Sequence, residues 1–382
     1  MKKPNIFIHM IFGFLIKIIA LFKGQTSIEK CKIKGPAVVL SNHTSFYDFI
    51  YTSAALYPRR VTYLAASKMF YEPLTGFFLR LARAVPKSLM QADPAATIKA
   101  FRMLEKGGIV SIFPEGQISP MNRTLTPAYS IAKFLKKANV DVYIVKHMGA
   151  GLVNPPWSKY SFKGKIETIK KLIINKTALK DMSLDEIYQK LKDELFYSAS
   201  IDNLKKKYKY QIKPIMNLEN VIYQCPSCLY EGLTSHKNQL ICPSCKHTLT
   251  YDQYGLLNGE GLDTLFLKQE ARVRKEIDAH KAYHISGKTK LMSFRNHKLI
   301  VVGEGTLTIN KEAYIYRGTI DGEDKILSFK VSSTPTLPSD IGRNVQIYED
   351  NMIYQFEIDI PWLPTKIVHV GEYMFEMSIN SI

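Results

Sequence analysis

Short apolar runs alternate with polar turns and helix-like segments between residues 36 and 150. Runs of this length, separated by helical segments, are typical of the buried strands of a mostly parallel sheet that is covered on both faces. The runs are 36–40 (PAVVL), 61–66 (VTYLAA), 109–113 (IVSIF) and 140–145 (VDVYIV). This pattern predicts an α/β domain with a mostly parallel sheet flanked by helices, and we expect it to span residues 25–200.

Helix boundaries are marked between and after these runs. Asp93 is a candidate N-cap, Pro94 suits the first helical position, and Gly107 follows the predicted end of that helix. Ser183 and Glu186 have the spacing of a capping box at the start of a later helix. These signals predict two of the helices of the α/β domain.

The N-terminal segment, residues 1–24, is almost wholly apolar from residue 6 to residue 22, with interruptions at His9, Gly13 and Lys17. Crossing a bilayer takes at least about 17 apolar residues, so the stretch lies at that limit and carries a lysine near its middle. The residues at and just beyond the end of this run, LFKGQTS (21–27), offer no small-residue cleavage site for a signal peptide. We expect a membrane-associating helix that lies in the interface. A single span and a helix buried in a soluble core stay open.

The sequence pattern changes after the α/β domain. Residues 201–222 contain the basic run LKKKYKY and are expected to form a linker, whereas residues 265–279 are amphipathic and predict a helix. Further on, short runs rich in β-branched and aromatic residues alternate with glycine turns, which predicts a small antiparallel barrel or sandwich within residues 260–382. The tail after Pro364 stays open between a closing helix and a last strand.

Four of the five cysteines form two CPSC motifs separated by thirteen residues. Two such turns at this separation are typical of a zinc ribbon, in which four thiolates close a tetrahedron and leave no open position for water. We expect residues 223–250 to be a zinc ribbon with a structural zinc ion, and a single iron ion is the alternative. The expected ligands are Cys225, Cys228, Cys242 and Cys245. Cysteines that are few in number and paired at metal-ligand spacing favour a protein of a reducing compartment over a protein built on disulfides.

Polar side chains follow the predicted strands at their carboxyl ends, where open α/β sheets form their sites. His43 and Asp48 follow the first run with four residues between them, and Glu115 follows the third run. A histidine can act as a general base near neutral pH, and a carboxylate within reach holds its ring in the useful tautomer. No serine or cysteine nucleophile with the required partners stands out. The pattern therefore favours direct activation of a substrate hydroxyl. Lys68 and His147 lie at the same predicted edge.

Two motifs carry a family resemblance. NHTSFYD (42–48) resembles the NHxSxxD motif of the glycerolipid acyltransferases, the 1-acylglycerol-3-phosphate acyltransferase family, and FPEG (113–116) resembles that family's third motif. The resemblance covers residues 25–200 and implies transfer of an acyl chain from acyl-CoA or acyl carrier protein to the hydroxyl of a lysoglycerolipid. It implies that His43 is the base, that Asp48 is its partner, and that Glu115 and Gly116 help to bind the acceptor.

The chain departs from the family where the acceptor's phosphate is expected to bind. Gln117 and Ile118 stand where the third motif continues with Thr-Arg, and the resemblance implies that the arginine meets this phosphate. Lys87 stands near the place of a second-motif arginine, and Arg123 is a candidate substitute for the missing one. A phosphate acceptor, 1-acylglycerol-3-phosphate, is the first choice. A different lysolipid, a non-phosphate acceptor and a catalytically silent lipid-binding scaffold stay open.

The formal charge of +18, from 52 basic and 34 acidic residues, predicts an anionic partner. The basic residues are spread along the chain, and no aromatic-lined nucleic-acid motif appears. We therefore expect an anionic membrane surface, at the cytoplasmic face, and no nucleic acid. The C-terminal β-rich segment weakly resembles PH-like or GRAM-like barrels, which implies lipid or protein binding.

Overall fold

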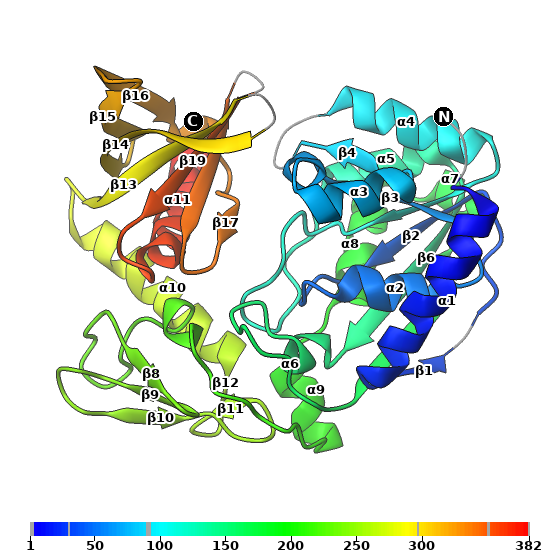
Figure 1. Cartoon of the computed structure of the whole chain (residues 1–382), viewed down its shortest axis with the longest axis horizontal. Helices are drawn as coiled ribbons and strands as arrows, with labels where there is room; N and C mark the ends of the chain where they lie inside the picture. Colours follow the sequence, from blue (N-terminus) through cyan, green and yellow to red (C-terminus); the bar gives the residue numbers. More distant parts are fainter. Residues whose placement is uncertain (1–3, 30, 89–92, 296–297, 350–351, 381–382) are drawn as a thin grey trace. The chain divides into compact units, whose positions relative to one another are not determined.

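The computed structural model describes residues 4–29, 31–88, 93–295, 298–349 and 352–380 (Figure 1). The chain forms two compact units. The first unit comprises residues 1–156, 160–213 and 253–255, and the second comprises residues 157–159, 214–252 and 256–382.

The first unit is built on a seven-stranded sheet with the order β1-β7-β6-β2-β5-β3-β4. The strands are β1 (Gln25–Glu29), β2 (Ala37–Ser41), β3 (Val61–Ala66), β4 (Val85–Lys87), β5 (Ile109–Ile112), β6 (Asp141–Met148) and β7 (Ile166–Ile174). Strands β2 to β6 run parallel to one another, whereas β7 is antiparallel to β6 and β1 is parallel to β7. The predicted α/β class with a mostly parallel sheet is confirmed.

Helices cover both faces of this sheet. They are α1 (Ile6–Phe22), α2 (Asp48–Leu56), η1 (Ser67–Phe70), α3 (Pro73–Leu81), α4 (Pro94–Glu105), α5 (Ser130–Ala138), α6 (Ala150–Val153), α7 (Lys176–Asp181), α8 (Leu184–Leu195) and α9 (Ala199–Lys206). Alternate residues of β2 enter different cores: Val38 packs in the core that includes α4, α5 and α8, whereas Val39 packs in the core that includes Leu56. This alternation explains why the strand is apolar at every position.

The helix signals read from the sequence have their expected partners. The Asp93 side chain accepts a hydrogen bond from the Ala96 amide at the start of α4. Ser183 and Glu186 form a complete capping box at the start of α8. These caps satisfy backbone donors that the first turn of a helix leaves unpaired.

Helix α1 packs along α2 rather than standing apart from the domain (Figure 1). Asn5 caps its first turn, Ala20 is buried, and Gly13 lies so close to the Tyr57 ring that a Cβ there would come within 2.8 Å of it. Among the residues that the structure describes, no helix is long and apolar enough to span a bilayer.

The second unit combines the cysteine segment with a β-rich region. Its strands are β8 (Thr234–His236), β9 (Gln239–Ile241), β10 (Thr248–Thr250), β11 (Leu256–Leu257), β12 (Glu260–Gly261), β13 (His284–Arg295), β14 (Lys298–Asn310), β15 (Ala313–Ile320), β16 (Glu323–Lys330), β17 (Ser339–Asp340), β18 (Asn344–Glu349) and β19 (Met352–Ile358). Its helices are η2 (Leu218–Asn220), α10 (Leu262–Ala279), η3 (Val331–Ser333) and α11 (Leu363–Asn380).

An antiparallel sheet with the order β16-β15-β14-β13-β19-β18-β17 forms the β-rich region. Strand β13 joins the two halves of this sheet because it pairs with both β14 and β19. Helix α11 follows β19 and contributes Ile367 and Val370 to the core, so the tail after Pro364 is a closing helix. The predicted antiparallel β-rich region is confirmed, and its likeness to PH-like or GRAM-like barrels stays a prediction.

The cysteine segment and the β-rich region share contacts within the second unit. Lys366, at the start of α11, is mostly buried and its Nζ lies 2.6 Å from Glu231 Oε1 and 3.1 Å from Glu276 Oε2. Tyr223 stacks on Trp362 with 5.4 Å between ring centroids. These contacts join the two segments, which belong to the same unit. The boundaries of a ribbon at 223–250 and a domain at 260–382 stay predictions.

The segment expected as a linker, residues 201–222, is ordered and divided between the units. Residues up to 213 belong to the first unit, and those from 214 belong to the second. The basic run is compatible with order because Lys206 Nζ lies 2.7 Å from Glu167 Oε2 and 3.0 Å from Asp202 Oδ1. The carboxylate of Glu167 is contributed by β7. The assignment of residues 201–222 as a linker stays a prediction, and the boundary between the two units lies within this segment.

Candidate active site

The turn between β2 and α2, residues 42–48, is called here the His–Asp turn. His43 Nδ1 lies 3.1 Å from Asp48 Oδ2, and the same oxygen accepts hydrogen bonds from the Thr44 amide at 2.7 Å and the Ser45 amide at 2.8 Å. Asp48 is completely buried and stands at the first position of α2. The carboxylate is therefore held by the main chain of its own turn, which fixes its position relative to the imidazole.

The His43 ring is oriented by two contacts. Its Nδ1 faces Asp48, and its face stacks on the Phe113 ring with 4.3 Å between centroids. About a fifth of the side chain is exposed, at 18%. Because Nδ1 is engaged with the carboxylate, Nε2 is the nitrogen that can take a proton from a bound group.

Glu115 lies beside His43, as expected, and both of its carboxylate oxygens meet the main chain. Oε1 accepts from the His43 amide and Oε2 accepts from the Leu125 amide, each at 2.8 Å. Burial raises the pKa of Glu115 well above its ordinary value, and the two amide hydrogen bonds oppose that rise. Glu115 thus joins the His–Asp turn to the loop that follows β5. The neighbouring Gly116 has a φ of +75°, a conformation that glycine adopts without strain.

Asn42 has a structural role that the sequence did not reveal. Its side-chain amide donates to the His147 carbonyl at 2.9 Å, and its carbonyl oxygen accepts from the His147 amide at 2.7 Å. The side chain thereby continues the pairing of β2 with β6 beyond the end of β2. The sequence signals were an asparagine directly after a buried strand and its place as the first residue of the NHTSFYD motif.

His147 is a buried residue of the sheet and not a second base. Its Nε2 lies 2.9 Å from Thr52 Oγ1 and its Nδ1 lies 3.0 Å from Thr168 Oγ1. Burial lowers the pKa of His147 to about 4, so the ring is neutral near physiological pH. Both ring nitrogens serve to join β6, α2 and β7.

The two candidate phosphate ligands lie differently from His43. Lys87 is on β4, separated from β2 in the sheet by β5 and β3, and its Nζ donates to the Ser88 carbonyl at 3.0 Å. Burial lowers the pKa of Lys87, with the charge of Asp93 opposing. The guanidinium of Arg123 lies 5.2 Å from the centroid of the Phe196 ring. None of these described contacts brings Lys87 or Arg123 to His43.

Residues 21–147 match the family model described as Acyltransferase, and this stretch contains His43, Asp48 and Glu115. The 1-acyl-sn-glycerol-3-phosphate acyltransferase of Bacillus subtilis (strain 168) is 25% identical over 104 residues, which are 26% of this chain and 52% of that protein. Residues 21–147 of the first unit therefore form an acyltransferase domain, as the matching family model describes it. The chain spans about half the length of this curated relative.

The acyltransferase domain also has a neighbour among solved structures. The crystal structure of the 1-acyl-sn-glycerophosphate (LPA) acyltransferase from Thermotoga maritima superposes with a TM-score of 0.42 and 19% sequence identity. The superposition covers 52% of this chain and 79% of that chain.

The four cysteines of the CPSC motifs converge outside the acyltransferase domain. Their Sγ atoms all lie within 4.8 Å of one another, with 3.7 Å between Cys225 and Cys245 and 3.6 Å between Cys228 and Cys242. No pair forms a disulfide. A tetrahedron with zinc–sulfur bonds of about 2.3 Å places its sulfurs about 3.8 Å apart. The observed spacing therefore fits a tetrahedral metal ion.

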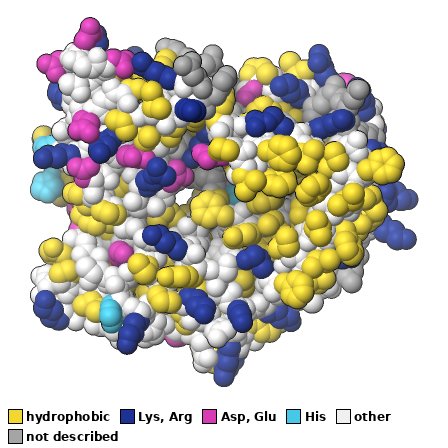
Figure 2. Space-filling view, viewed as in Figure 1, with side chains coloured by type: hydrophobic (Ala, Val, Ile, Leu, Met, Phe, Trp, Pro, Cys, Tyr) yellow, Lys and Arg dark blue, Asp and Glu magenta, His cyan; other side chains and the backbone are white. Residues whose placement is uncertain are grey.

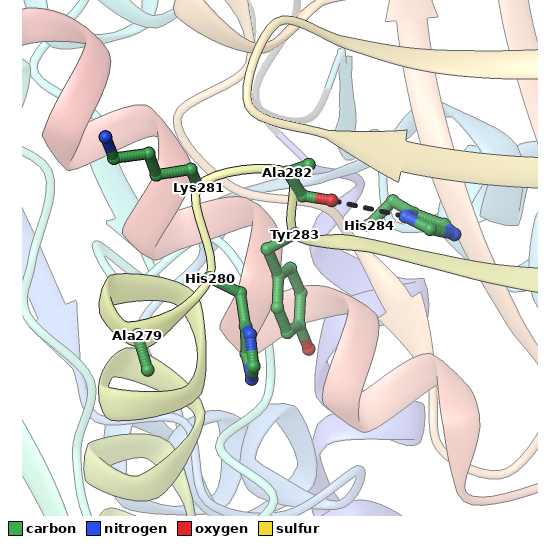
Figure 3. Close-up of a pocket in the computed structure, with 6 residues that line it drawn as sticks. All are labelled: Ala279, His280, Lys281, Ala282, Tyr283 and His284. Carbon is green, nitrogen blue, oxygen red and sulfur yellow. Dashed lines mark hydrogen bonds between the residues drawn. The ribbon is translucent and has the colours of Figure 1, made fainter.

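A shallow hollow in the loop between α10 and β13 is not a second catalytic site (Figure 3). It is lined by Ala279, His280, Lys281, Ala282, Tyr283 and His284. Figure 3 shows His280 and His284 pointing in different directions, with His284 Nδ1 at 3.3 Å from the Ala282 carbonyl. None of the lining residues carries a carboxylate or a thiol, so the lining offers no histidine–carboxylate pair like that of His43 and Asp48.

Proposed function

We propose that the protein is an O-acyltransferase that moves a fatty acyl chain from a thioester, acyl-CoA or acyl carrier protein, to the hydroxyl of a lysoglycerolipid. The first choice of acceptor is 1-acylglycerol-3-phosphate. The observation that carries this proposal is the His43–Asp48 contact of 3.1 Å, fixed by backbone amides and by Glu115 in a domain that matches the Acyltransferase family model.

In the proposed reaction His43 Nε2 removes the proton from the acceptor hydroxyl while its oxygen attacks the thioester carbonyl. The tetrahedral intermediate collapses, its carbon–sulfur bond breaks, and the proton on His43 passes to the leaving thiolate. Asp48 stabilises the imidazolium that exists between the two proton transfers. Glu115 acts on this step by holding the main chain of His43, and so it is a positioning residue.

The surface of the acyltransferase domain supports docking on a membrane. Figure 2 shows hydrophobic side chains gathered over α1, α2 and α3. Exposed members include Phe7, Ile11, Phe14 and Phe22 on α1, Phe46 and Phe49 at the His–Asp turn and the start of α2, and Leu74 and Phe77 on α3. Large exposed apolar patches mark interaction sites, and apolar faces of this kind enter the headgroup boundary of a bilayer.

We place this docking at an anionic membrane surface on the cytoplasmic side. The edge contact between Phe12 and Phe78, with 5.9 Å between centroids, makes the patches on α1 and α3 continuous. Phe46 and Phe49 belong to the segment that carries His43 and Asp48. The proposed site therefore opens beside the surface from which a lysolipid would arrive, and the net charge of +18 favours anionic lipid.

We also propose that the four cysteines hold a structural zinc ion. The donor set is four thiolates at tetrahedral spacing, which leaves no position open for water or substrate. Zinc would hold the segment in its fold and take no part in acyl transfer. Measuring zinc per mole of purified protein tests this assignment against iron.

The test of acyl transfer is an assay across a panel of lysolipid acceptors, with acyl-CoA and acyl carrier protein compared as donors. We expect lysolipid-dependent release of free thiol by the unaltered protein. His43→Ala should lower the rate about a thousandfold, because a positioned general base contributes about 10²- to 10⁴-fold. A variant with an unchanged melting temperature and an unchanged rate would contradict the assignment of His43 as the base.

A catalytically silent lipid-binding protein is the second candidate. The observation that favours it is Gln117-Ile118 in the place of the family's Thr-Arg after FPEG. Under this alternative the protein binds lysolipid vesicles or micelles but consumes no thioester with any donor. If the protein is instead an acyltransferase for a different acceptor, it consumes the thioester and prefers a lysolipid other than 1-acylglycerol-3-phosphate.

A further inference from the structure

Lys23 lies at the same edge of the sheet as the His–Asp turn. It is the C-cap residue of α1, two residues before β1 begins at Gln25. Strand β1 runs parallel to β7, and β7 runs antiparallel to β6, which is itself parallel to β2. The start of β1 therefore lies where β2 ends and the His–Asp turn begins.

The ammonium of Lys23 is held in place by neutral groups. Its Nζ donates to Asn154 Oδ1 and to Ser161 Oγ, each at 3.1 Å, and lies 4.3 Å from the centroid of the Tyr47 ring. The Asn154 amide nitrogen donates to the Tyr51 hydroxyl, which directs Oδ1 of Asn154 towards Lys23. Tyr47 directly precedes Asp48, so the cation packs against the segment that carries the proposed catalytic pair.

This cation has no anionic partner in the part of the chain that the structure describes. Burial lowers the pKa of Lys23, and no neighbouring carboxylate opposes that shift. Lys206 of the same domain, in contrast, lies 2.7 Å from Glu167, and Lys87 has the charge of Asp93 nearby. A partly desolvated charge without a counter-charge is costly, and an anion brought by a ligand removes that cost.

We propose that Lys23 Nζ binds the phosphate of a lipid beside the His–Asp turn. The ammonium has three donors, and Asn154 and Ser161 occupy two of them, which leaves one for an anionic oxygen. Lysine binds phosphate as a point charge. The position at the end of the apolar helix α1 is where phosphate groups of a docked bilayer lie, since cationic side chains meet the headgroup layer there.

The phosphate that Lys23 binds can come from two lipids, and the inference rests on the proposed function only where that lipid is the acyl acceptor. The phosphate belongs either to the acceptor, where Lys23 would supply the positive charge that is absent after FPEG, or to a lipid of the bilayer. Both sources offer the same phosphate oxygens to the ammonium, and both place the bound lipid against Tyr47. The experiment therefore distinguishes the two phosphate sources by testing acceptor lipids and bilayer lipids separately, each with and without a phosphate.

Three variants test the proposal. Lys23→Gln removes the charge and keeps a hydrogen-bonding side chain, whereas Lys23→Arg restores the charge. Lys17→Gln is the matched control, because Lys17 lies on the same helix with its Nζ 5.7 Å from the centroid of the Tyr57 ring. Each protein is measured for binding of radiolabelled 1-acylglycerol-3-phosphate and of monoacylglycerol in detergent. Each is also measured for sedimentation with phosphatidylglycerol vesicles and with vesicles of a phosphate-free galactolipid.

If the acceptor supplies the phosphate, Lys23→Gln weakens binding of 1-acylglycerol-3-phosphate about tenfold and leaves monoacylglycerol binding unchanged. If the bilayer supplies it, partition onto phosphatidylglycerol vesicles falls about tenfold and partition onto galactolipid vesicles does not. In either case Lys23→Arg recovers most of the loss and Lys17→Gln has a smaller effect.

The proposal is overturned if Lys23→Gln changes none of these affinities. It is also overturned if phosphate-bearing and phosphate-free lipids are affected equally, because that result indicates a purely structural lysine. These readouts need no turnover. Absence of acyl transfer by the unaltered protein would therefore refute the proposed function while leaving the binding results to decide on Lys23.

Discussion

The His–Asp turn and the four-cysteine cluster both begin as short motifs of fixed spacing, but they reach their geometry by different means. In the turn, amides of Thr44 and Ser45 hold Asp48, and Glu115 holds the main chain of His43. In the cysteine cluster, four thiols face one another, with Cys225 Sγ 3.7 Å from Cys245 Sγ and Cys228 Sγ 3.6 Å from Cys242 Sγ. The protein's own hydrogen bonds preorganise the first site, whereas under the proposed zinc assignment a bound ion would stabilise the four converging thiolates of the second.

Two buried carboxyl groups, one in each unit, also differ in the groups that surround them. Glu115 in the first unit accepts one backbone amide at each oxygen. Glu372 in the second unit accepts a hydrogen bond from Thr336 Oγ1, and the charges of Glu270 and Glu376 face it. Burial, together with these like charges, raises the pKa of Glu372 to about 7, although the charge of Arg274 opposes the rise. Burial raises the pKa of both carboxyl groups, and the two differ in what surrounds them: two backbone amides oppose the rise at Glu115, whereas neighbouring carboxylates add to it at Glu372.

The largest effect should come from removing the metal ligands. We expect Cys228→Ser, or treatment with a strong chelator, to unfold the cysteine segment and loosen the start of α11, because Lys366 and Trp362 contact that segment. Zinc-peptide folding depends on about 10–16 kcal/mol of metal binding. Both tryptophans, Trp157 and Trp362, lie in the second unit, so tryptophan fluorescence reports its unfolding.

The control for this experiment is Cys31→Ser, since Cys31 lies in the first unit and outside the cluster. This variant should retain its zinc content and its fluorescence transition. If Cys228→Ser also keeps both, the cysteine cluster is not needed for the fold of the second unit, and the contrast with the His–Asp turn fails.

A smaller effect is expected from Glu372, and it depends on pH. The folded protein favours the protonated form, because the pKa of Glu372 is raised to about 7 from its ordinary value of 4.5. Its contribution to stability is therefore complete below pH 4.5 and is lost as the pH rises through 7. The loss is at most about 3 kcal/mol. We expect Glu372→Gln to flatten this decline in denaturant unfolding followed by tryptophan fluorescence between pH 5 and pH 8.

A matched variant for Glu372 is Glu376→Gln, which removes a neighbouring carboxylate that forms an ion pair with Arg274. It should lower the pKa of Glu372 only in part and leave most of the pH dependence in place. A decline with rising pH that persists unchanged in Glu372→Gln would assign the titration to another group.

The smallest effect on stability should come from Glu115→Gln, which tests directly whether hydrogen bonds hold the His–Asp turn in place. The amide side chain keeps the shape of the carboxylate but can accept from only one of the two amides of His43 and Leu125. Leaving one buried donor unpaired costs about 1–3 kcal/mol. We expect a matching fall in the free energy of unfolding.

Glu115→Gln should also lower the rate of acyl transfer about 10- to 100-fold, because His43 is displaced while its side chain remains. The KM for the acceptor should change little, since both oxygens of Glu115 face the main chain. A variant that raises the KM severalfold and leaves kcat unchanged would show instead that Glu115 binds the acceptor directly, as the sequence resemblance implied.

Local patterns in the sequence predicted much of the fold. The apolar runs became strands β2, β3, β5 and β6, and the capping signals at Asp93 and Ser183 became the caps of α4 and α8. These predictions succeeded because strand burial and helix capping depend on residues a few positions apart. The motifs likewise indicated His43 with Asp48, since both belong to one turn.

Tertiary structure decided the features that depend on distant partners. Glu115 meets an amide 72 positions away, and Lys23 meets an oxygen 131 positions away, because strand order brings their segments to one edge of the sheet. Lys206, in the basic segment expected as a linker, pairs with the carboxylate of Glu167, which β7 contributes. The sequence by itself determined which local elements form and which chemistry they carry. Only the folded chain determined which donors and charges surround each group, because those neighbours come from segments that local patterning does not relate.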